Sequence, residues 1–369
     1  MKQDGDTRLL IVRLRDPLGL DRVLKLCGIT SPSPRFRRHA PNLVTVQVDG
    51  DPRETHERVA ELAEVDRVFA LDRGWLHERW PIDPAGEPGA IAGLAFDAGR
   101  PVVLAGPCSV EGVAQVRGIA KAVAEAGADG LRGGVFKPRT SPYEFGGLGD
   151  DGLAMLVAAG RAHGLPVVTE VLEPGCVEAV AAGADLMQIG SRNMHNAPFL
   201  FQLGAHPRGR PALLKRGFGA TIDELLWAAE YFLLGRLAGL HDSPGLVLCE
   251  RGLRGFPTET RFSLDVAAVP VLRRRTRLPV VVDPSHPAGD RELVVPLALA
   301  GLAAGASGLL VEVHTDPPRA WCDGAQSLTP EAFGELMQAV RGGSAGPGAK
   351  PREGKQATDP HPEPVPPRP

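Results

Sequence analysis

A short segment, residues 131–142, combines cationic side chains with small and rigid ones. Arg132, Lys137 and Arg139 fall within eight residues, with two glycines between them and prolines at positions 138 and 142. Arginine binds carboxylates and phosphates through its planar fork, lysine acts as a point charge, and glycine lets a ligand approach the backbone. The segment therefore indicates an anion-binding loop, although an ordinary basic turn has a similar composition.

Further cations recur along the chain. Together with the three above, they form one set of candidate anion-binding residues: Arg132, Lys137, Arg139, Arg192, Lys215 and Arg251. Six cations that converge in a dry pocket repel one another strongly unless a multiply charged anion neutralises them. If these residues share a pocket, its ligand carries several phosphate or carboxylate groups.

A second set of residues has the chemistry of metal ligands. Cys108, His286, Glu312 and Asp323 offer a thiolate, an imidazole and two carboxylates. Such a mixed set suits a divalent metal ion such as Mn, Fe, Co or Zn, whereas Mg and Ca prefer oxygen ligands. These residues lie far apart in the sequence, so the site depends on the fold. Taken alone, Cys108 is equally well explained as a small buried hydrophobic residue.

The elements that would position these residues repeat one theme from residue 101 onwards. Short, almost continuous apolar runs alternate with Ala/Leu-rich segments of helical period, as is typical of strands covered by helices. The predicted strands are residues 101–105, 130–136, 166–171, 185–189, 212–215, 246–249, 279–282 and 308–313. Eight such units predict a (β/α)8 TIM barrel. A doubly wound sheet is less favoured, because no glycine-rich dinucleotide turn follows the first strand.

In a barrel of this kind, the carboxyl ends of the strands form the active site. Every predicted strand ends near a chemically active group. In chain order these groups are Cys108; Arg132 with Lys137 and Arg139; Glu170; Arg192; Lys215 with Arg216; Glu250 with Arg251; Asp283 with His286; and Glu312 with His314. A single charged strand end is usually a solvated turn, but eight of eight indicate a shared site.

Residues 1–80 predict a separate, small N-terminal domain. Strands at 9–14, 35–39, 43–48 and 65–71, with helices at 20–27 and 54–63, give the β-α-β-β-α-β order of a ferredoxin-like α+β fold. This segment holds no chemical constellation, which favours a regulatory role. A linker is predicted at 81–98, with a short hairpin at 91–96, followed by the catalytic barrel at 99–342 and a disordered tail at 343–369.

Composition narrows the class of protein. The 369 residues include 41 Lys and Arg against 44 Asp and Glu, a net charge of −3, which argues against a nucleic-acid partner. No apolar run approaches the roughly 18 residues that indicate a membrane span. Five scattered cysteines indicate free thiols in a reducing compartment. We therefore expect a cytoplasmic protein with no nucleic-acid and no membrane partner.

Around these residues the chain contains a series of segments that match a known family. They occur in this order: AGPCSVE (105–111), LRGGVFKPRTSPY (131–143), QIGSRN (188–193), LKRGF (214–218), LCERG (248–252), DPSH (283–286), VEVH (311–314) and DGAQS (323–327). In these segments the chain resembles the metal-dependent 3-deoxy-7-phosphoheptulonate (DAHP) synthases of the type I β branch, which share their barrel with the 3-deoxy-octulosonate 8-phosphate synthases.

The resemblance implies an aldol-like condensation of phosphoenolpyruvate with erythrose 4-phosphate and water, which gives DAHP and phosphate at the first step of the shikimate pathway. It implies a divalent ion on Cys108, His286, Glu312 and Asp323 that polarises the aldehyde. Lys137, Cys108 and His286 are the candidate catalytic residues. The implied binding residues are Arg132, Lys137 and Lys215 for the phosphoenolpyruvate carboxylate, Arg192 and Arg251 with Glu170 for its phosphate, and Arg139 and Thr140 for the erythrose 4-phosphate phosphate.

Three positions bear on the acceptor sugar and on redox chemistry. Pro138, in the order Lys-Pro-Arg-Thr, resembles the heptulosonate enzymes, whereas the octulosonate relatives have Lys-Ala-Asn-Arg. Phe262 and Cys322 depart from the family, which usually has Asn and Ser there, and leave open another acceptor in specialised metabolism. Because Cys322 adjoins Asp323, we also hypothesise that Cys108 and Cys322 form a disulfide on oxidation when the metal is lost.

Two other functions remain open. Lys215 at a strand end is the residue that a Schiff-base aldolase would use. The barrel could instead be a non-catalytic phosphometabolite sensor, although a sensor does not need the complete metal set. For residues 1–80, the resemblance implies a domain that binds an aromatic amino acid or prephenate, or covers the barrel mouth, in a homotetramer.

Overall fold

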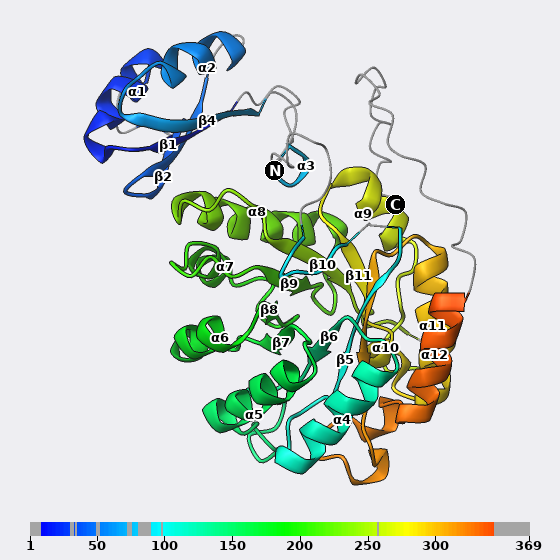
Figure 1. Ribbon diagram of the computed structural model, residues 1–369. Coiled ribbons are helices and arrows are strands. Elements are labelled where there is room, and N and C mark those ends of the chain that lie inside the picture. Colours follow the sequence, from blue (N-terminus) through cyan, green and yellow to red (C-terminus); the bar gives the residue numbers. More distant parts are fainter. Residues whose placement is uncertain are drawn as a thin grey trace.

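The chain folds into two units, shown in Figure 1. The computed structural model describes residues 9–29, 33, 35–48, 52–71, 76–79, 90–96, 99–256 and 258–342. The tail predicted at 343–369 and most of the linker predicted at 81–98 lie outside these residues. Within them, no helix is long and apolar enough to cross a membrane.

The N-terminal unit is a four-stranded antiparallel sheet with helices on one face, as predicted. Its elements are β1 (Leu9–Leu14), α1 (Leu20–Leu26), β2 (Phe36–Ala40), β3 (Leu43–Gln47), α2 (Pro52–Ala60) and β4 (Val65–Leu71), in the sheet order β2-β3-β1-β4. Alternate residues of β1 lie in two different hydrophobic core clusters. Leu10 and Val12 are buried with residues of α1 and α2, whereas Ile11 belongs to the core cluster of the larger unit.

The larger unit is a closed barrel of eight parallel strands, which confirms the predicted fold. The strands are β5 (Val102–Gly106), β6 (Gly130–Arg132), β7 (Val167–Glu170), β8 (Leu186–Ile189), β9 (Ala212–Lys215), β10 (Leu246–Glu250), β11 (Val280–Val282) and β12 (Gly308–Glu312), and β12 pairs with β5 to close the barrel. The helices are α4 (Val113–Glu125), α5 (Gly149–Ala162), α6 (Val177–Gly183), α7 (Ala197–Gly204), α8 (Ile222–Ala238), α9 (Ala268–Arg275), α10 (Ser285–Ala288), α11 (Arg291–Ala303) and α12 (Pro330–Gly342).

Successive residues of each barrel strand face opposite sides. In β5, Val103 and Ala105 join the cluster that contains the helices, whereas Val102 and Leu104 join the cluster inside the barrel. The inner cluster also contains Ile91, Leu94 and Phe96, all nearly inaccessible to solvent. The segment predicted as a hairpin, in which Ile91 and Leu94 pair, therefore plugs the barrel beside the first residues of its strands.

Strand β6 is shorter than the predicted range 130–136, which is wrong beyond Arg132. Gly133 still donates its amide to the Val168 carbonyl of β7 (3.0 Å), but Gly134 then pairs with Ser109, beyond the end of β5. Val135 is fully buried in the outer core. The apolar run continues past Arg132 because residues there are buried in the core, and not because the strand continues.

A short helix that the sequence did not predict, α3 (Leu76–Arg79), ties the segment after the N-terminal sheet to the barrel. His77 is buried, and its Nδ1 lies 2.6 Å from Glu230 Oε1 on α8. The Glu230 carboxylate also accepts the His77 backbone amide, and Thr276 donates its hydroxyl to the His77 carbonyl. The N-terminal sheet itself contacts the end of α8, where Asn42 donates to the Ala238 carbonyl.

Candidate active site

A single cavity of about 420 Å³ gathers the predicted cations. It lies at the carboxyl ends of the barrel strands. All six cations predicted from the sequence line it, together with Thr140, Glu170, His286 and Asp323. Two further cations, Arg254 and Arg261, line the same cavity and were not predicted. Cys108 and Glu312 lie behind this wall and are almost completely buried.

Arg132 is the last residue of β6, next to the end of β5, and its side chain is fixed there. Its Nη1 donates to the Pro107 carbonyl (2.8 Å) and to Glu312 Oε1 (3.1 Å). Position 106 must be glycine for this approach, because a Cβ there would lie 2.0 Å from the Arg132 carbonyl oxygen. Among the described residues, the buried Nε of Arg132 has no hydrogen-bond partner. The guanidinium is therefore held in place and keeps a donor for a ligand.

Lys137 reaches back from the loop after β6 to the first strand end. Its Nζ donates to the Cys108 carbonyl (3.0 Å) and to Cys108 Sγ (3.2 Å). Gly134 makes room for this path, since a Cβ there would lie 2.6 Å from Lys137 Cδ. Burial opposes the charged form, but Cys108, Cys322 and Glu312 more than offset it and raise the pKa of Lys137. Lys137 is therefore an ammonium group at neutral pH.

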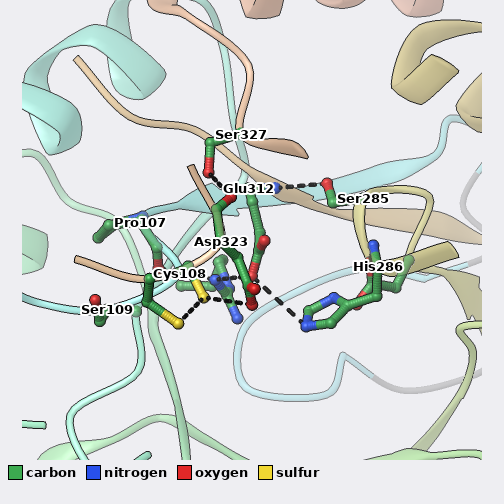
Figure 2. Close-up of polar contacts among 12 residues, drawn as sticks. Pro107, Cys108, Ser109, Ser285, His286, Glu312, Asp323 and Ser327 are labelled. Carbon is green, nitrogen blue, oxygen red and sulfur yellow. Dashed lines mark hydrogen bonds and ion pairs between the residues drawn. The ribbon is translucent and has the colours of Figure 1, made fainter. Parts of the chain in front are cut away.

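The predicted metal ligands lie together, as Figure 2 shows. Donor atoms of His286, Glu312 and Asp323 all lie within 4.8 Å of one another, and Cys108 Sγ lies 3.3 Å from Asp323 Oδ2. The His286 ring presents Nε2 to Glu312 Oε1 (3.7 Å), while its Nδ1 lies 2.7 Å from Asp283 Oδ2. A carboxylate behind the imidazole is the usual way of orienting a histidine ligand.

The protonation states of these groups also fit a metal ion. Burial lowers the pKa of His286, and, although burial works against it, His286 and Arg132 lower the pKa of Glu312. A neutral imidazole and an ionised carboxylate are the forms that bind metals. The contact with Cys322, burial and Glu312 raise the pKa of the Cys108 thiol. A bound cation opposes this shift because it stabilises the thiolate.

Two phenylalanines organise the arginines on the other side of the cavity. Phe218 and Phe262 stack with their ring centroids 5.5 Å apart, and the Arg251 guanidinium carbon lies 4.9 Å and 4.2 Å from the two rings. Arg192 and Arg254 approach the same Phe218 ring, at 5.4 and 5.3 Å. Among the described residues, Nε and Nη1 of Arg251 are buried without a partner. Cation–π contacts thus hold guanidiniums whose donors are not used up by carboxylates.

The two cations that follow β9 have different environments. Lys215 Nζ donates to Asp283 Oδ2 at 2.6 Å inside the barrel and lines the cavity. Arg216 instead binds Glu250 and Asp265, and is absent from the cavity wall. The Lys215 Nζ is thus engaged by a buried carboxylate, which argues against Lys215 as a free-amine nucleophile.

With this geometry established, comparisons with known proteins identify the family. The family model described as "DAHP synthetase I family" matches residues 91–342. The chain belongs to the DAHP synthetase I family. It is therefore an enzyme of this family, and not a non-catalytic phosphometabolite sensor.

Individual relatives agree with the family model. A phospho-2-dehydro-3-deoxyheptonate aldolase of Thermotoga maritima is 46% identical over 239 residues, which cover 65% of this chain and 68% of the relative. A crystal structure of the DAHP synthase from the same organism is similar at 36% identity with a TM-score of 0.66, covering 91% of this chain and 96% of that chain. A 2-dehydro-3-deoxyphosphooctonate aldolase of Rhodopseudomonas palustris is 32% identical over 257 residues, 64% of this chain and 86% of the relative.

The residues that the sequence did not predict belong to the loop after β10. Arg254 and Arg261 lie four and eleven residues beyond Glu250, and neither was assigned to a strand end or to a matching motif. A bridge between Leu253 and Ser263 folds this loop back over the cavity. Arg261 Nη1 then binds Asp323 Oδ1 and Gln326 Oε1, both at 3.0 Å. Only the repeated Arg-Gly pairs at 251–252 and 254–255 could have signalled this loop.

Proposed function

We propose that this chain catalyses the condensation of phosphoenolpyruvate with erythrose 4-phosphate and water to give DAHP and phosphate. The observation that carries the proposal is the single cavity in which eight cations adjoin a thiol, an imidazole and two carboxylates. Two phosphorylated substrates supply the negative charge that such a cavity needs. Membership of the DAHP synthetase I family points to the same reaction.

The metal-ligand residues fit a divalent ion. Cys108, His286, Glu312 and Asp323 would hold it, and Mn, Fe, Co or Zn suits this donor set. When bound, the ion supplies Lewis acidity to the aldehyde carbonyl of the acceptor. The protein's own contribution is the orientation of the ligands: Gln326 donates to Glu312 Oε2 (2.6 Å), and Ser285 accepts the Glu312 amide.

The phosphoenolpyruvate site is proposed on the side of the cavity formed by β6, β8, β9 and β10. Arg132, Lys137 and Lys215 bind the carboxylate in this scheme. Their positive charges compensate for the water that the carboxylate loses when it enters the cavity. Arg192 and Arg251 bind the phosphate through donors that have no carboxylate partner among the described residues. Glu170, held by Gln188 Nε2 at 3.0 Å, faces the same space. Fixing both reactants in one geometry lowers the barrier by several kcal/mol, on the order of the gains seen for intramolecular reactions.

Arg139 and Thr140 form the proposed site for the phosphate of erythrose 4-phosphate. Arg139 Nε binds Glu144 Oε2 at 2.8 Å, and Thr140 Oγ1 accepts from Arg192 Nη2 at 3.3 Å. Thr140 therefore lies between the two phosphate sites. The Lys-Pro-Arg-Thr order and the higher identity to the heptonate enzyme than to the octonate enzyme both favour the four-carbon acceptor.

A phosphate-release assay tests this proposal. Purified protein is given phosphoenolpyruvate with either erythrose 4-phosphate or arabinose 5-phosphate, after chelation and again after addition of Mn or Zn. We expect release only with erythrose 4-phosphate and only with metal. Release that persists after chelation contradicts the metal role, and release with the five-carbon sugar alone contradicts the choice of acceptor.

For the N-terminal unit we propose regulation in a homotetramer, with an aromatic amino acid or prephenate as effector. The support is its sheet, which holds no catalytic constellation and contacts α8 of the barrel. Light scattering after size exclusion measures the assembly, and inhibition assays with the three aromatic amino acids and prephenate identify the effector. A monomer whose rate is insensitive to all four compounds contradicts this role.

A further inference from the structure

We propose that Cys322 is an additional sulfur ligand of the metal ion, beside Cys108. This inference rests on the metal site of the proposed function. Cys322 is buried, and its Sγ lies 3.2 Å from Cys108 Sγ. Donor atoms of Cys108, Cys322 and Asp323 all lie within 4.8 Å of one another, as do those of His286, Glu312 and Asp323. Asp323 belongs to both groups and therefore links the two sets of donors.

The backbone explains how two consecutive residues reach the same site. In an extended chain, successive side chains point in opposite directions. Asp323 instead has φ 51° and ψ 35°, a left-handed conformation that non-glycine residues seldom adopt. Strain of this kind persists where the surroundings enforce it and is concentrated at functional sites.

Neighbouring contacts hold the loop in this conformation. Before Cys322, the Trp321 amide donates to Glu111 Oε1 at 2.8 Å, and Glu111 also binds Ser109 and His314. After Asp323, Gly324 packs so closely that a Cβ would lie 2.1 Å from the Pro317 carbonyl oxygen. The loop is thus fixed on both sides, and the thiol and the carboxylate are presented together.

Two cations lie beside the sulfur pair. Arg139 Nη1 lies 2.6 Å from Cys322 Sγ, and Lys137 Nζ lies 3.2 Å from the adjacent Cys108 Sγ. Cysteine binds a metal ion as the thiolate, whose negative charge is complementary to these cations. Two thiolates, an imidazole and two carboxylates form a softer donor set than one with a single sulfur. We therefore expect this chain to prefer Zn or Cd over Mn more strongly than a site with Cys108 alone.

X-ray absorption at the zinc edge tests the assignment by counting sulfurs. The full chain is loaded anaerobically with one equivalent of zinc, without substrates. We expect two sulfurs at about 2.3 Å in the wild type and one in Cys322→Ser. Cys27→Ser is the matched control, because Cys27 is a buried thiol of the N-terminal unit, and this variant should retain two sulfurs.

The outcomes separate this inference from the function on which it rests. One sulfur in the wild type overturns the role of Cys322 but leaves the metal-dependent reaction intact. A wild type that binds no zinc overturns both the inference and the metal site. Two sulfurs without phosphate release from either sugar support the inference and contradict the proposed reaction. If Cys322→Ser fails to fold, the wild-type count decides alone.

Discussion

At the scale of single residues, the proposed phosphate side of the cavity depends on a ring that carries no charge. Phe218 lies under three guanidiniums, those of Arg192, Arg251 and Arg254, at 4.9 to 5.4 Å. Like charges at this spacing repel, and the negative face of the ring offsets part of that repulsion. In the proposed function, the dianionic phosphate of phosphoenolpyruvate offsets the rest.

Arg254 should therefore contribute to substrate binding although it was not predicted. We expect Arg254→Ala to raise the KM for phosphoenolpyruvate by roughly tenfold to a hundredfold, the cost of about 1.5–3 kcal/mol for a lost hydrogen bond to a charged group. Steady-state kinetics with varied phosphoenolpyruvate measure this. Arg117→Ala, which removes an exposed arginine of α4, is the control and should leave KM unchanged. Equal values for both variants contradict the role of Arg254.

The sulfur pair leads to a prediction about oxidation. With the metal removed, peroxide should join Cys108 and Cys322, because their sulfurs already lie 3.2 Å apart. The two thiols lose two electrons and two protons, and hydrogen peroxide becomes two waters. Peptide mapping by mass spectrometry should show the crosslink in the chelated protein and little of it after zinc loading. Both thiols still free after peroxide treatment of the chelated protein would rule this out.

The sequence predicted which residues lie at the strand ends, but it did not predict the direction and contacts of their side chains. Strand-end positions follow from the barrel pattern, so Arg132, Lys215 and His286 could be placed before the structure was known. The sequence could not predict whether a cation faces the cavity or the barrel wall. Lys215 and Arg216, for example, are adjacent but make contacts on different sides. Side-chain direction depends on neighbours from distant strands.

At the scale of elements, the apolar pattern gave strand positions but not their ends. The run from 130 to 136 continues past β6 because Val135 is buried, and the ladder stops where Gly133 and Gly134 turn the chain. Helix α3 escaped prediction for a different reason. It has four residues, too few for a helical period, and depends on its contacts with α8.

Those contacts should make α3 a measurable part of barrel stability. We expect His77→Ala to lower the free energy of unfolding by about 1–3 kcal/mol, since the buried Glu230 carboxylate loses the imidazole and keeps only backbone amide donors. Urea unfolding followed by circular dichroism measures the change. The control is His206→Ala, whose partner Glu178 is largely exposed, and its effect should be about 0–1 kcal/mol. Similar losses in the two variants would show that the His77 pair contributes little.

At the scale of the whole molecule, charge is unevenly distributed. The chain carries a net charge of −3, yet eight cations line one cavity. In the unliganded protein we expect repulsion among the cations that are not paired with carboxylates to destabilise the fold, and salt screens that repulsion. The same screening weakens the attraction for an anionic substrate.

Salt should therefore stabilise the unliganded protein and weaken the stabilisation that the substrate adds. Raising NaCl from about 0.1 to 1 M, which shortens the Debye length from roughly 10 to 3 Å, should raise the Tm of the unliganded protein. The increase in Tm caused by phosphoenolpyruvate should shrink over the same range. Differential scanning calorimetry measures both. A substrate-induced shift that does not depend on salt would show that the cavity charges are already compensated within the protein.

The plug formed by Ile91, Leu94 and Phe96 sets a practical limit for protein engineering. The regular barrel begins with Val102, so a gene cut there would look complete on a diagram of strands. Such a product would lose three large apolar side chains from the inner core cluster and leave the lower layer of the barrel open to water. Each lost side chain would cost on the order of 2–5 kcal/mol. An excised barrel for library selection or domain fusion should therefore start at residue 90 or earlier, and a new N-terminal partner should be joined ahead of that point.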